Sequence, residues 1–444
     1  MSSFDEKAYY EPTDDLRYDL LKVPVHVDKD TEESINTTIY PQSGKSGTYY
    51  NSAAGNQTVF DITADGNALE DLANYRLAVR MRAIELLTSD GVTERTITTD
   101  SGIPWCFSAL IDRITIKAND NSTLLEDHTS TGLYKDSCLF RMLKKYDSAT
   151  LENHDEAMFT PCIESGLDLT GALSTESAAR TTRWLIPAGT TGYVQKNIPF
   201  HDLLSCCDNP GFSANTRKLH IEITWRLPNE IPFYANTALT THTPRIYIDT
   251  VYIWKDAQKM SVSQNITTLR ERLAGEVEKM AYCYYNASNQ TYTQNAQIKV
   301  TSQMNSQSIA SAFRATTVDG TNNRNYMQYV PNGTTAVSVE YGNVVIPRQI
   351  VTVSSSSIDL YTFYKKAIRK QNNVNFAPAV PFRAFNWYYI MWFGTTESTF
   401  PKLERQAKDV KINIQGAATF QCLVVVENLW SPQLAADGTV VVSK

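Results

Sequence analysis

Two runs of strand-forming residues, one near the middle of the chain and one at its end, constrain the fold more than any other feature. The first is 245–254 (RIYIDTVYIW) and the second is 418–427 (ATFQCLVVVE). β-Branched and aromatic residues at this density favour pleated, half-buried surfaces. Each run closes a β-rich block of roughly two hundred residues. The sequence therefore predicts two tandem β-sandwiches.

The first block, residues 56–260, shows apolar side chains at every second position, interrupted by polar turns. Such alternation predicts half-buried strands. The predicted strands are 58–63, 75–87, 108–118, 183–186, 194–198, 218–226 and 246–254, with a turn at 67–72 and a helix near 132–146.

The second block, residues 281–444, has eight strand candidates separated by Gly, Asn and Pro turns. They are 282–285, 296–302, 308–316, 336–341, 349–353, 387–393, 410–414 and 419–427. This pattern fits a jelly roll or another antiparallel sandwich. Neither block has a βαβ rhythm, which argues against a parallel sheet. We therefore predict an all-β fold of two tandem eight-stranded antiparallel jelly rolls, a double jelly roll.

Between the blocks, residues 261–280 carry the clearest helical pattern. Apolar residues recur there at three and four positions: Ile266, Leu269, Leu273, Val277 and Met280. This spacing places them on one face of a helix of about four turns. The sequence predicts a short helical linker that joins the two sandwiches.

Residues 1–55 are predicted to form an acidic N-terminal arm. Through Ser34 the chain has ten acidic and four basic residues, which leaves 37 of each sign in the remainder. A basic arm would neutralise phosphates, and this arm has the opposite charge. We therefore expect no nucleic-acid binding by the arm and no sequence-specific nucleic-acid partner. A short apolar stripe in the arm is suited to docking: Leu16, Tyr18, Leu20, Leu21, Val23 and Val25.

The cysteines and the apolar stretches bear on the compartment. Seven cysteines are scattered without recurring spacing, a pattern that suits a reducing environment. The first residues lack a basic segment followed by an apolar core, so no signal peptide is predicted. No apolar stretch approaches the ~20 residues that cross a bilayer. We expect synthesis in the cytoplasm or nucleus of a host cell, without secretion.

Several local motifs resemble binding or catalytic sites, and each fails on spacing. Gly44-Lys45-Ser46 lacks the earlier glycine of a phosphate-binding loop, because Ile39 stands at that position. Cys206 and Cys207 are adjacent, which is poor geometry for two ligands of one zinc ion. His201-Asp202 is read as part of a structured turn rather than as an acid/base pair.

Other polar clusters are read in the same way. The acidic segment 28–33 lacks the glycine and the spacing of a calcium loop. Seven Asn-x-Ser/Thr sequons record loop composition, since no signal peptide is predicted. The aromatic residues of 385–393 are assigned to a core and a subunit contact. We predict no catalytic, cofactor-binding or metal-binding residue, no cofactor, and no enzymatic activity.

The order of these segments resembles the double jelly-roll major capsid proteins of tailless icosahedral double-stranded DNA viruses, in particular the virophage, adintovirus and Polinton-like group. The segments that carry the resemblance are 59–62 with 70–81, 103–119 with 132–135, 198–204 with 218–223, 246–254, 262–280, and 423–427 with the tail 429–442. The resemblance covers most of residues 56–444.

The resemblance implies a function in virion assembly. A chain with two rolls has pseudo-sixfold repetition as a trimer, so three copies form a pseudo-hexagonal capsomer that tiles a shell. The expected partners are other copies of the chain, penton and minor capsid proteins, and an inner membrane reached by the arm.

Three alternatives remain open at this stage. One is a minor capsid, penton or spike protein of similar build. Another is a carbohydrate-binding or carbohydrate-cleaving β-sandwich, for which Asp359 and Glu397 are the nearest carboxylate candidates. The last is a single-jelly-roll capsid protein of an RNA virus with an added domain, against which the acidic arm argues.

Overall fold

The structure is a computed structural model. It describes residues 34–45, 47–63, 68–70, 72–98, 101–103, 106–118, 123–128, 133–145, 185–186, 189, 193–208, 218–231, 234–235, 242–259, 278–279, 282–293, 295–301, 306–314, 334–341, 344–352, 391–394, 409–416, 420–430, 432–434 and 440–442.

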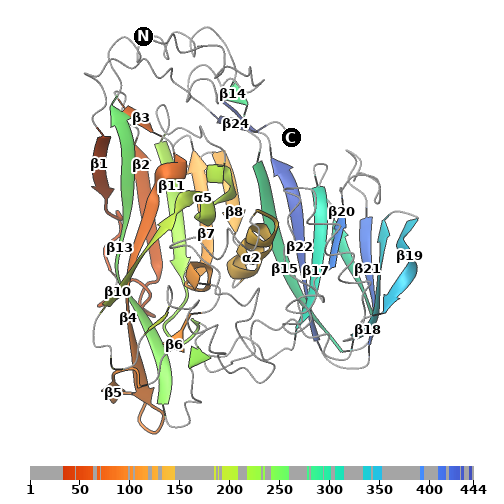
Figure 1. Cartoon of the computed structure of the whole chain (residues 1–444), viewed down its shortest axis with the longest axis horizontal. Coiled ribbons are helices and arrows are strands. Elements are labelled where there is room, and N and C mark those ends of the chain that lie inside the picture. The colour runs from red at the N-terminus through yellow and green to blue at the C-terminus, as the bar shows by residue number, and fades with distance from the viewer. Residues whose placement is uncertain are drawn as a thin grey trace, which may run out of the picture.

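The first sandwich consists of two main antiparallel sheets (Figure 1). One has the order β1 (Ser34–Ile39), β13 (His242–Lys259), β4 (Arg76–Leu87), β10 (Tyr193–Pro199). The other has the order β2 (Gln57–Thr63), β11 (Lys218–Trp225), β7 (Ile111–Ala118), β8 (Thr123–His128). Numbered along the chain, these eight strands pair as 1-8-3-6 and 2-7-4-5, which is jelly-roll connectivity.

The second sandwich repeats this connectivity. One sheet has the order β15 (Tyr282–Tyr292), β22 (Phe420–Trp430), β17 (Ser306–Arg314), β20 (Met391–Gly394). The other has the order β16 (Ala296–Thr301), β21 (Asp409–Gly416), β18 (Thr334–Tyr341), β19 (Val344–Thr352). Its strands also pair as 1-8-3-6 and 2-7-4-5, so β1 and β13 hold the same places in the first sandwich as β15 and β22 hold in the second.

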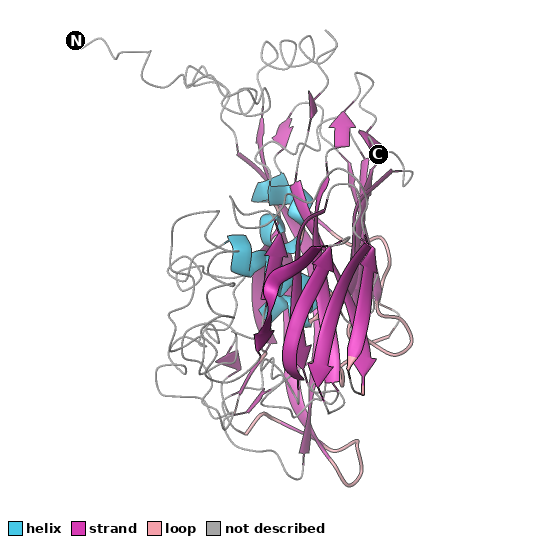
Figure 2. Ribbon diagram, turned by 90° about the vertical axis from the view of Figure 1, so that its right-hand side faces the viewer, coloured by secondary structure: helices cyan, strands magenta, loops and turns pink. Residues whose placement is uncertain are grey.

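Short elements complete the described fold. The additional strands are β3 (Ala68–Glu70), β5 (Glu94–Arg95), β6 (Ser101–Gly102), β9 (Leu185–Ile186), β12 (Tyr234–Ala235), β14 (Glu278–Lys279), β23 (Pro432–Leu434) and β24 (Val440–Val442). The helical elements are α2 (Tyr134–Lys145), α5 (Phe200–Leu203) and the 3-10 turns η2 (Leu72–Asn74), η3 (Cys106–Ala109) and η6 (Ser205–Asp208). The described helices gather in one group to one side of the sheets (Figure 2).

The core of the first sandwich follows from strict alternation along its strands. Phe60, Ile221 and Ile116 lie opposite one another on β2, β11 and β7, and all three are fully buried. Burying one such side chain contributes about 1.5–3 kcal/mol. The buried indole of Trp225 donates from Nε1 to Thr58 Oγ1 over 2.7 Å, so its polar atom is satisfied inside the core.

The predicted strands have counterparts in the structure, including all eight of the second block. The helix predicted near 132–146 is α2. The turn predicted around His201 forms α5, and Leu204 connects α5 to η6. Among the eight main strands of the first roll, β1 and β8 were not predicted. Within the predicted turn 67–72, Ala68–Glu70 form the short strand β3 because they pair with the end of β13.

The predicted limits of the arm and linker need correction. Residues Ser34–Ile39, assigned to the arm, form β1 because the edge of β13 opposite to β4 offers them hydrogen-bonding groups. Glu278–Lys279, assigned to the linker helix, pair with β23 as β14. Residues 1–33 and 260–277, and with them most of the arm and linker, lie outside the described residues. The exact division at 56–260, 261–280 and 281–444 stays a prediction.

Candidate functional site

The two sandwiches meet at a junction built around α2. Helix α2 and the 3-10 turn η6, both from the first sandwich, contact β15, and α2 also contacts β22. Figure 1 shows α2 between the strands of the two sandwiches. The first and last strands of the second sandwich therefore rest against helical elements of the first.

A hydrogen bond crosses this junction at a β-bulge. Along β8, Glu126 lies opposite Ile116 and Leu124 lies opposite Lys117, so Leu125 is the extra residue of the bulge. A bulge leaves one residue outside the regular ladder. The carbonyl oxygen of Leu125 accepts a hydrogen bond from the hydroxyl of Tyr282, the buried first residue of β15.

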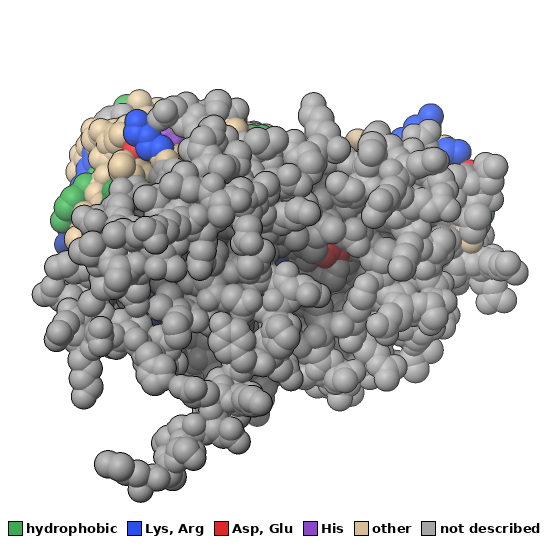
Figure 3. All heavy atoms as spheres, turned by 90° about the horizontal axis from the view of Figure 1, so that it is seen from above, with side chains coloured by type: hydrophobic (Ala, Val, Ile, Leu, Met, Phe, Trp, Pro, Cys, Tyr) green, Lys and Arg blue, Asp and Glu red, His purple; other side chains and the backbone are tan. Residues whose placement is uncertain are grey.

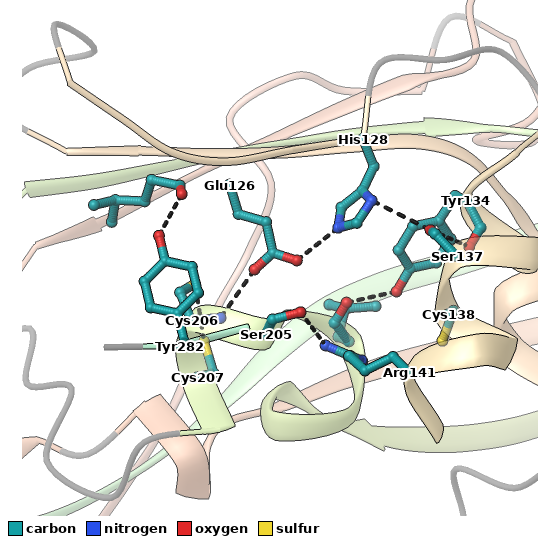
Figure 4. A network of polar contacts seen from close by, with 12 residues as sticks. Glu126, His128, Tyr134, Ser137, Cys138, Arg141, Ser205, Cys206, Cys207 and Tyr282 are labelled. Atoms are coloured by element: carbon teal, nitrogen blue, oxygen red, sulfur yellow. Dashed lines mark hydrogen bonds and ion pairs between the residues drawn. The ribbon is translucent and has the colours of Figure 1, made fainter. Parts of the chain in front are cut away.

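We call this hydrogen bond between Tyr282 and Leu125 the tether. Next to the tether lies a buried polar network centred on Glu126 (Figure 4). One carboxylate oxygen of Glu126 lies 2.6 Å from His128 Nε2, and the other accepts from the backbone N–H of Cys206 over 2.9 Å. Glu126 and His128 are separated by two positions, so they share one face of β8. The network thus joins β8 to η6.

The environment of Glu126 keeps its carboxyl ionised. Burial acts to raise its pKa, but the hydrogen bond and the charge of His128, the charge of Arg141 and the N–H of Cys206 outweigh burial and lower the pKa to about 2. A buried carboxylate with such partners is a fixed negative charge at neutral pH.

Helix α2 contributes the other half of the network. The Tyr134 hydroxyl donates to the carbonyl oxygen of Leu203 over 2.5 Å, and Arg141 donates to Ser205 Oγ over 3.2 Å. Both contacts fix α2 against the segment that contains α5 and η6. Burial raises the pKa of the Tyr134 hydroxyl and raises that of the Cys138 thiol to about 11, so both groups stay neutral.

Three of these residues resemble a catalytic triad in their order. Ser137 Oγ lies 3.3 Å from His128 Nδ1, and His128 Nε2 lies 2.6 Å from Glu126. The serine hydroxyl has one hydrogen, and it donates to the carbonyl oxygen of Tyr134 over 2.9 Å. Ser137, His128 and Glu126 are all buried. A nucleophile must reach its substrate, so this geometry supports cohesion of the junction rather than catalysis.

A second surface lies on the opposite side of the first sandwich. It is the outward face of the β1-β13-β4-β10 sheet, and its register places side chains in rows. Tyr193, Arg82 and Tyr247 form one row, and Ala78 and Tyr252 belong to another. We define the outer aromatic face as Tyr40, Tyr193, Tyr247, Tyr252 and Trp254 together with Arg76, Arg80 and Arg82.

Internal contacts hold the side chains of the outer aromatic face in place. Arg80 forms an ion pair with Asp249 and lies over the ring of Tyr193, 4.7 Å from its centroid. Gln195 donates to the hydroxyl of Tyr252 over 2.9 Å. Despite these contacts, Tyr40, Tyr193 and Trp254 stay 69%, 49% and 44% exposed. Figure 3 shows apolar and basic side chains side by side at this end of the molecule.

The motifs discounted in the sequence have structural roles where the structure describes them. Lys45 binds Asp249 over 3.2 Å. His201 Nδ1 lies 3.0 Å from the carbonyl oxygen of Ala73, while its Nε2 is 3.7 Å from Asp202. Cys206 and Cys207 are buried free thiols with sulfur atoms 3.9 Å apart.

Two negative findings hold for the described residues. No group of three or more His, Cys, Asp or Glu side chains in this part of the chain is arranged to hold a metal ion. No helix within the described ranges is long and apolar enough to span a membrane. The carboxylate candidates Asp359 and Glu397, and the aromatic residues 385–389, lie outside these ranges.

Sequence reasoning missed the network and the tether. The only sequence signal for the network is that two ionisable residues, Glu126 and His128, stand two positions apart in a short segment. That segment is equally compatible with a loop. Nothing in the sequence pairs Tyr282 with Leu125, since their contact depends on how the sandwiches meet.

No protein-family model matches the chain, and no curated protein matches it in sequence. Solved structures match along nearly its full length. The mavirus major capsid protein superposes with a TM-score of 0.56 at 13% identity, covering 100% of this chain and 95% of that one. The fold is that of the double jelly-roll major capsid proteins.

Two further structures with the double jelly-roll fold match. The Sputnik virophage structure gives a TM-score of 0.55 at 11% identity and covers 93% of this chain and 88% of the other. The PBCV-1 virus capsid gives 0.53 at 9% identity and covers 93% and 97%. The resemblance noted from the segment order is therefore confirmed at the level of the fold.

Proposed function

We propose that this chain is the major capsid protein of an icosahedral virus and that it assembles as pseudo-hexagonal trimers. The observation that carries the proposal is the duplication: two sandwiches with identical strand connectivity lie side by side in one chain. Three such chains around a threefold axis present six similar units, and closed symmetry limits the number of distinct contacts. The full-length similarity to the mavirus major capsid protein supports the same function.

In this function the junction between the two sandwiches holds them in a fixed relative position. A capsomer with six similar units requires that the two sandwiches of each chain keep a fixed relative position. The buried Glu126 network and the Tyr282 tether supply that rigidity from side chains that do no chemistry. We accordingly assign the chain no enzymatic activity.

The proposed partners are other copies of the chain in the capsid lattice, with penton and minor capsid proteins at its vertices and joints. The proposed location is the virion shell, after synthesis in the cytoplasm or nucleus of the host cell. The acidic arm of residues 1–33 is proposed to contact neighbouring capsomers or an inner membrane.

Mass determination and negative-stain microscopy of the purified protein test the proposal. We expect a species of three times the 49.9 kDa chain mass and particles of hexagonal outline. A stable monomer at micromolar concentration, or an elongated spike, would contradict it. Assay of the same sample against a panel of glycans examines the carbohydrate alternative, for which we expect neither binding nor cleavage.

A further inference from the structure

The two closing strands differ in how their outward sides are covered. Every residue of β22 from Cys422 to Glu427 is buried, so this strand is covered on both faces. Its counterpart β13 alternates instead: Ile246, Ile248 and Ile253 are buried, while Tyr247 and Tyr252 are half-buried and Trp254 is exposed.

The cover on β22 comes from the other sandwich of the same chain. Helix α2 contacts both β15 and β22, the first and last strands of the second jelly roll. Strands β1 and β13 hold the same places in the first jelly roll. Within one chain, the surface equivalent to the covered one is therefore the outer aromatic face.

The side chains of the outer aromatic face suit a surface that is exposed to solvent before assembly and buried after it. On the outward side of β22, which is the side of Tyr282 on the neighbouring strand β15, Val424 and Val426 are apolar. The outward side of β13 carries tyrosine and tryptophan instead. Tyrosine, tryptophan and arginine are the residue types enriched at the centres of protein interfaces. Their polar tips tolerate water, and their rings supply apolar contact area.

We propose that the outer aromatic face is the docking surface for a second copy of this chain. The second copy contributes the side of its second sandwich that corresponds to the α2 side of the first sandwich. The inference rests on the proposed function and adds the surface through which it operates. In this arrangement the contact between two copies repeats the contact between the two sandwiches of one chain. Each copy therefore offers its outer aromatic face to one neighbour and the side of its second sandwich to the other.

The geometry of such a contact favours a closed ring. A face on one copy that binds a different surface on the next is a heterologous contact, which forms a ring when the rotation closes. With two sandwiches per chain in repeated side-by-side order, three copies complete six positions. Arg80 and Arg82, already oriented by Asp249 and Glu94, lie at the centre of the face.

Substitution of exposed residues on the face tests the docking surface. We expect Trp254→Arg and Tyr193→Arg each to raise the trimer dissociation constant at least tenfold, seen by light scattering as monomer where the wild type is trimeric. Both side chains are about half exposed, so the variant monomer should stay folded with the circular dichroism spectrum of the wild type, and its unfolding midpoint should fall only by the stabilisation that trimer formation supplies. The matched control is Val92→Arg, which changes a 77% exposed residue in the turn that follows β4 and should leave the trimer intact.

The outcomes separate the two proposals. A wild-type protein that is itself monomeric contradicts the proposed function. A trimeric wild type whose trimer survives both face substitutions, or is lost equally in the Val92 control, overturns the docking surface and leaves the proposed function standing.

Cross-linking identifies what docks. A photoreactive phenylalanine analogue at position 252, in a mixed sample of isotopically light and heavy chains, should give cross-linked peptides that combine both labels and map to residues 281–444. Products within one chain, products that map to residues 1–33, or no products would overturn the assignment of the second copy's second sandwich.

Discussion

Glu126 illustrates how one residue connects a strand, a helix and a junction. It lies on β8, a strand of 6 residues of which only Leu124 and Leu125 are apolar, and it is ionised in a fully buried position because His128, Arg141 and the N–H of Cys206 stabilise its charge. An isolated buried carboxylate would be costly, whereas one whose two oxygens both have hydrogen-bond partners is tolerated. The charge therefore ties the stability of the junction to pH.

Acidification should weaken the protein through this residue. The folded-state pKa of Glu126, about 2, lies below its ordinary value of 4.5. Its contribution to stability is therefore fully present above pH 4.5 and is lost as the pH falls from 4.5 towards 2. Urea unfolding at pH 7, 4.5 and 3 should show a declining free energy of unfolding over the last interval.

The variant Glu126→Gln should remove part of that dependence. Losing the charge breaks the buried ion pair with His128 and removes the attraction to the charge of Arg141, so we expect a loss of about 3 kcal/mol at pH 7, by the general cost of breaking a buried ion pair. The slope between pH 4.5 and 3 should flatten. Glu222→Gln is the control, because Glu222 lies on the solvent-facing side of β11, and it should cost under about 1 kcal/mol. Equal losses in both variants would contradict the role of Glu126.

At the level of elements, local sequence pattern was sufficient wherever burial alternates along a strand. The long strand β4 and the closing strand β13 follow from period-two patterns. The closing strand β22 follows from its dense run of strand-forming residues, and the other seven strands of the second roll follow from short strand-forming segments between Gly, Asn and Pro turns. Strand β8 escaped prediction because Glu126 and His128 face a buried polar network, so its buried side has the composition of a loop. Strand β1 escaped because its sequence, SINTTI, is barely apolar and forms a strand only where β13 offers an edge.

The junction was equally hidden, since it depends on contacts between elements far apart in the chain. Leu125 and Tyr282 are separated by 157 positions. The bulge that exposes the Leu125 carbonyl arises from pairing between β7 and β8, and no local signal marks it. Sequence alone therefore predicted two sandwiches but not how one holds the other.

Removing the tether should loosen the two sandwiches without unfolding either. In Tyr282→Phe the Leu125 carbonyl loses its donor in a buried setting, which costs about 1–3 kcal/mol. Hydrogen–deuterium exchange should rise in β8 and β15 and stay unchanged in β2 and β21. The control Tyr292→Phe removes the hydroxyl that binds Gln290 on an exposed part of the same strand, and it should have little effect. Unchanged exchange in β8 would count against the tether.

For the whole molecule, the arm and the first sandwich must be separated at the right residue. The sequence placed the boundary at residue 55, but β1 begins at Ser34, and the following loop is also part of the sandwich. Asn51, fully buried, donates to the carbonyl oxygens of Arg226 and Ile246 and accepts from the N–H of Ile248. Any truncation beyond residue 33 therefore removes sheet and core contacts together with the arm.

Two deletions should consequently behave differently. Deletion of residues 1–33 removes ten of the acidic residues and leaves β1 paired with β13, so we expect an unchanged unfolding midpoint and intact trimers that do not form shells. Deletion of residues 1–55 also removes β1 and Asn51, so we expect a protein that is less stable and poorly soluble. Scanning calorimetry, light scattering and electron microscopy of assembly reactions report these properties separately.

The apolar stripe of the arm provides the sharper variant of this test. Leu20→Ser with Leu21→Ser keeps the length and the charge of the arm and removes two of its apolar side chains. If the arm docks through that stripe, this double variant should fail to form shells as the deletion of residues 1–33 does, because burial of each leucine contributes about 1.5–3 kcal/mol to a contact. Normal shells from the double variant would restrict the arm's role to its charge, and normal shells from the deletion would remove the arm from assembly altogether.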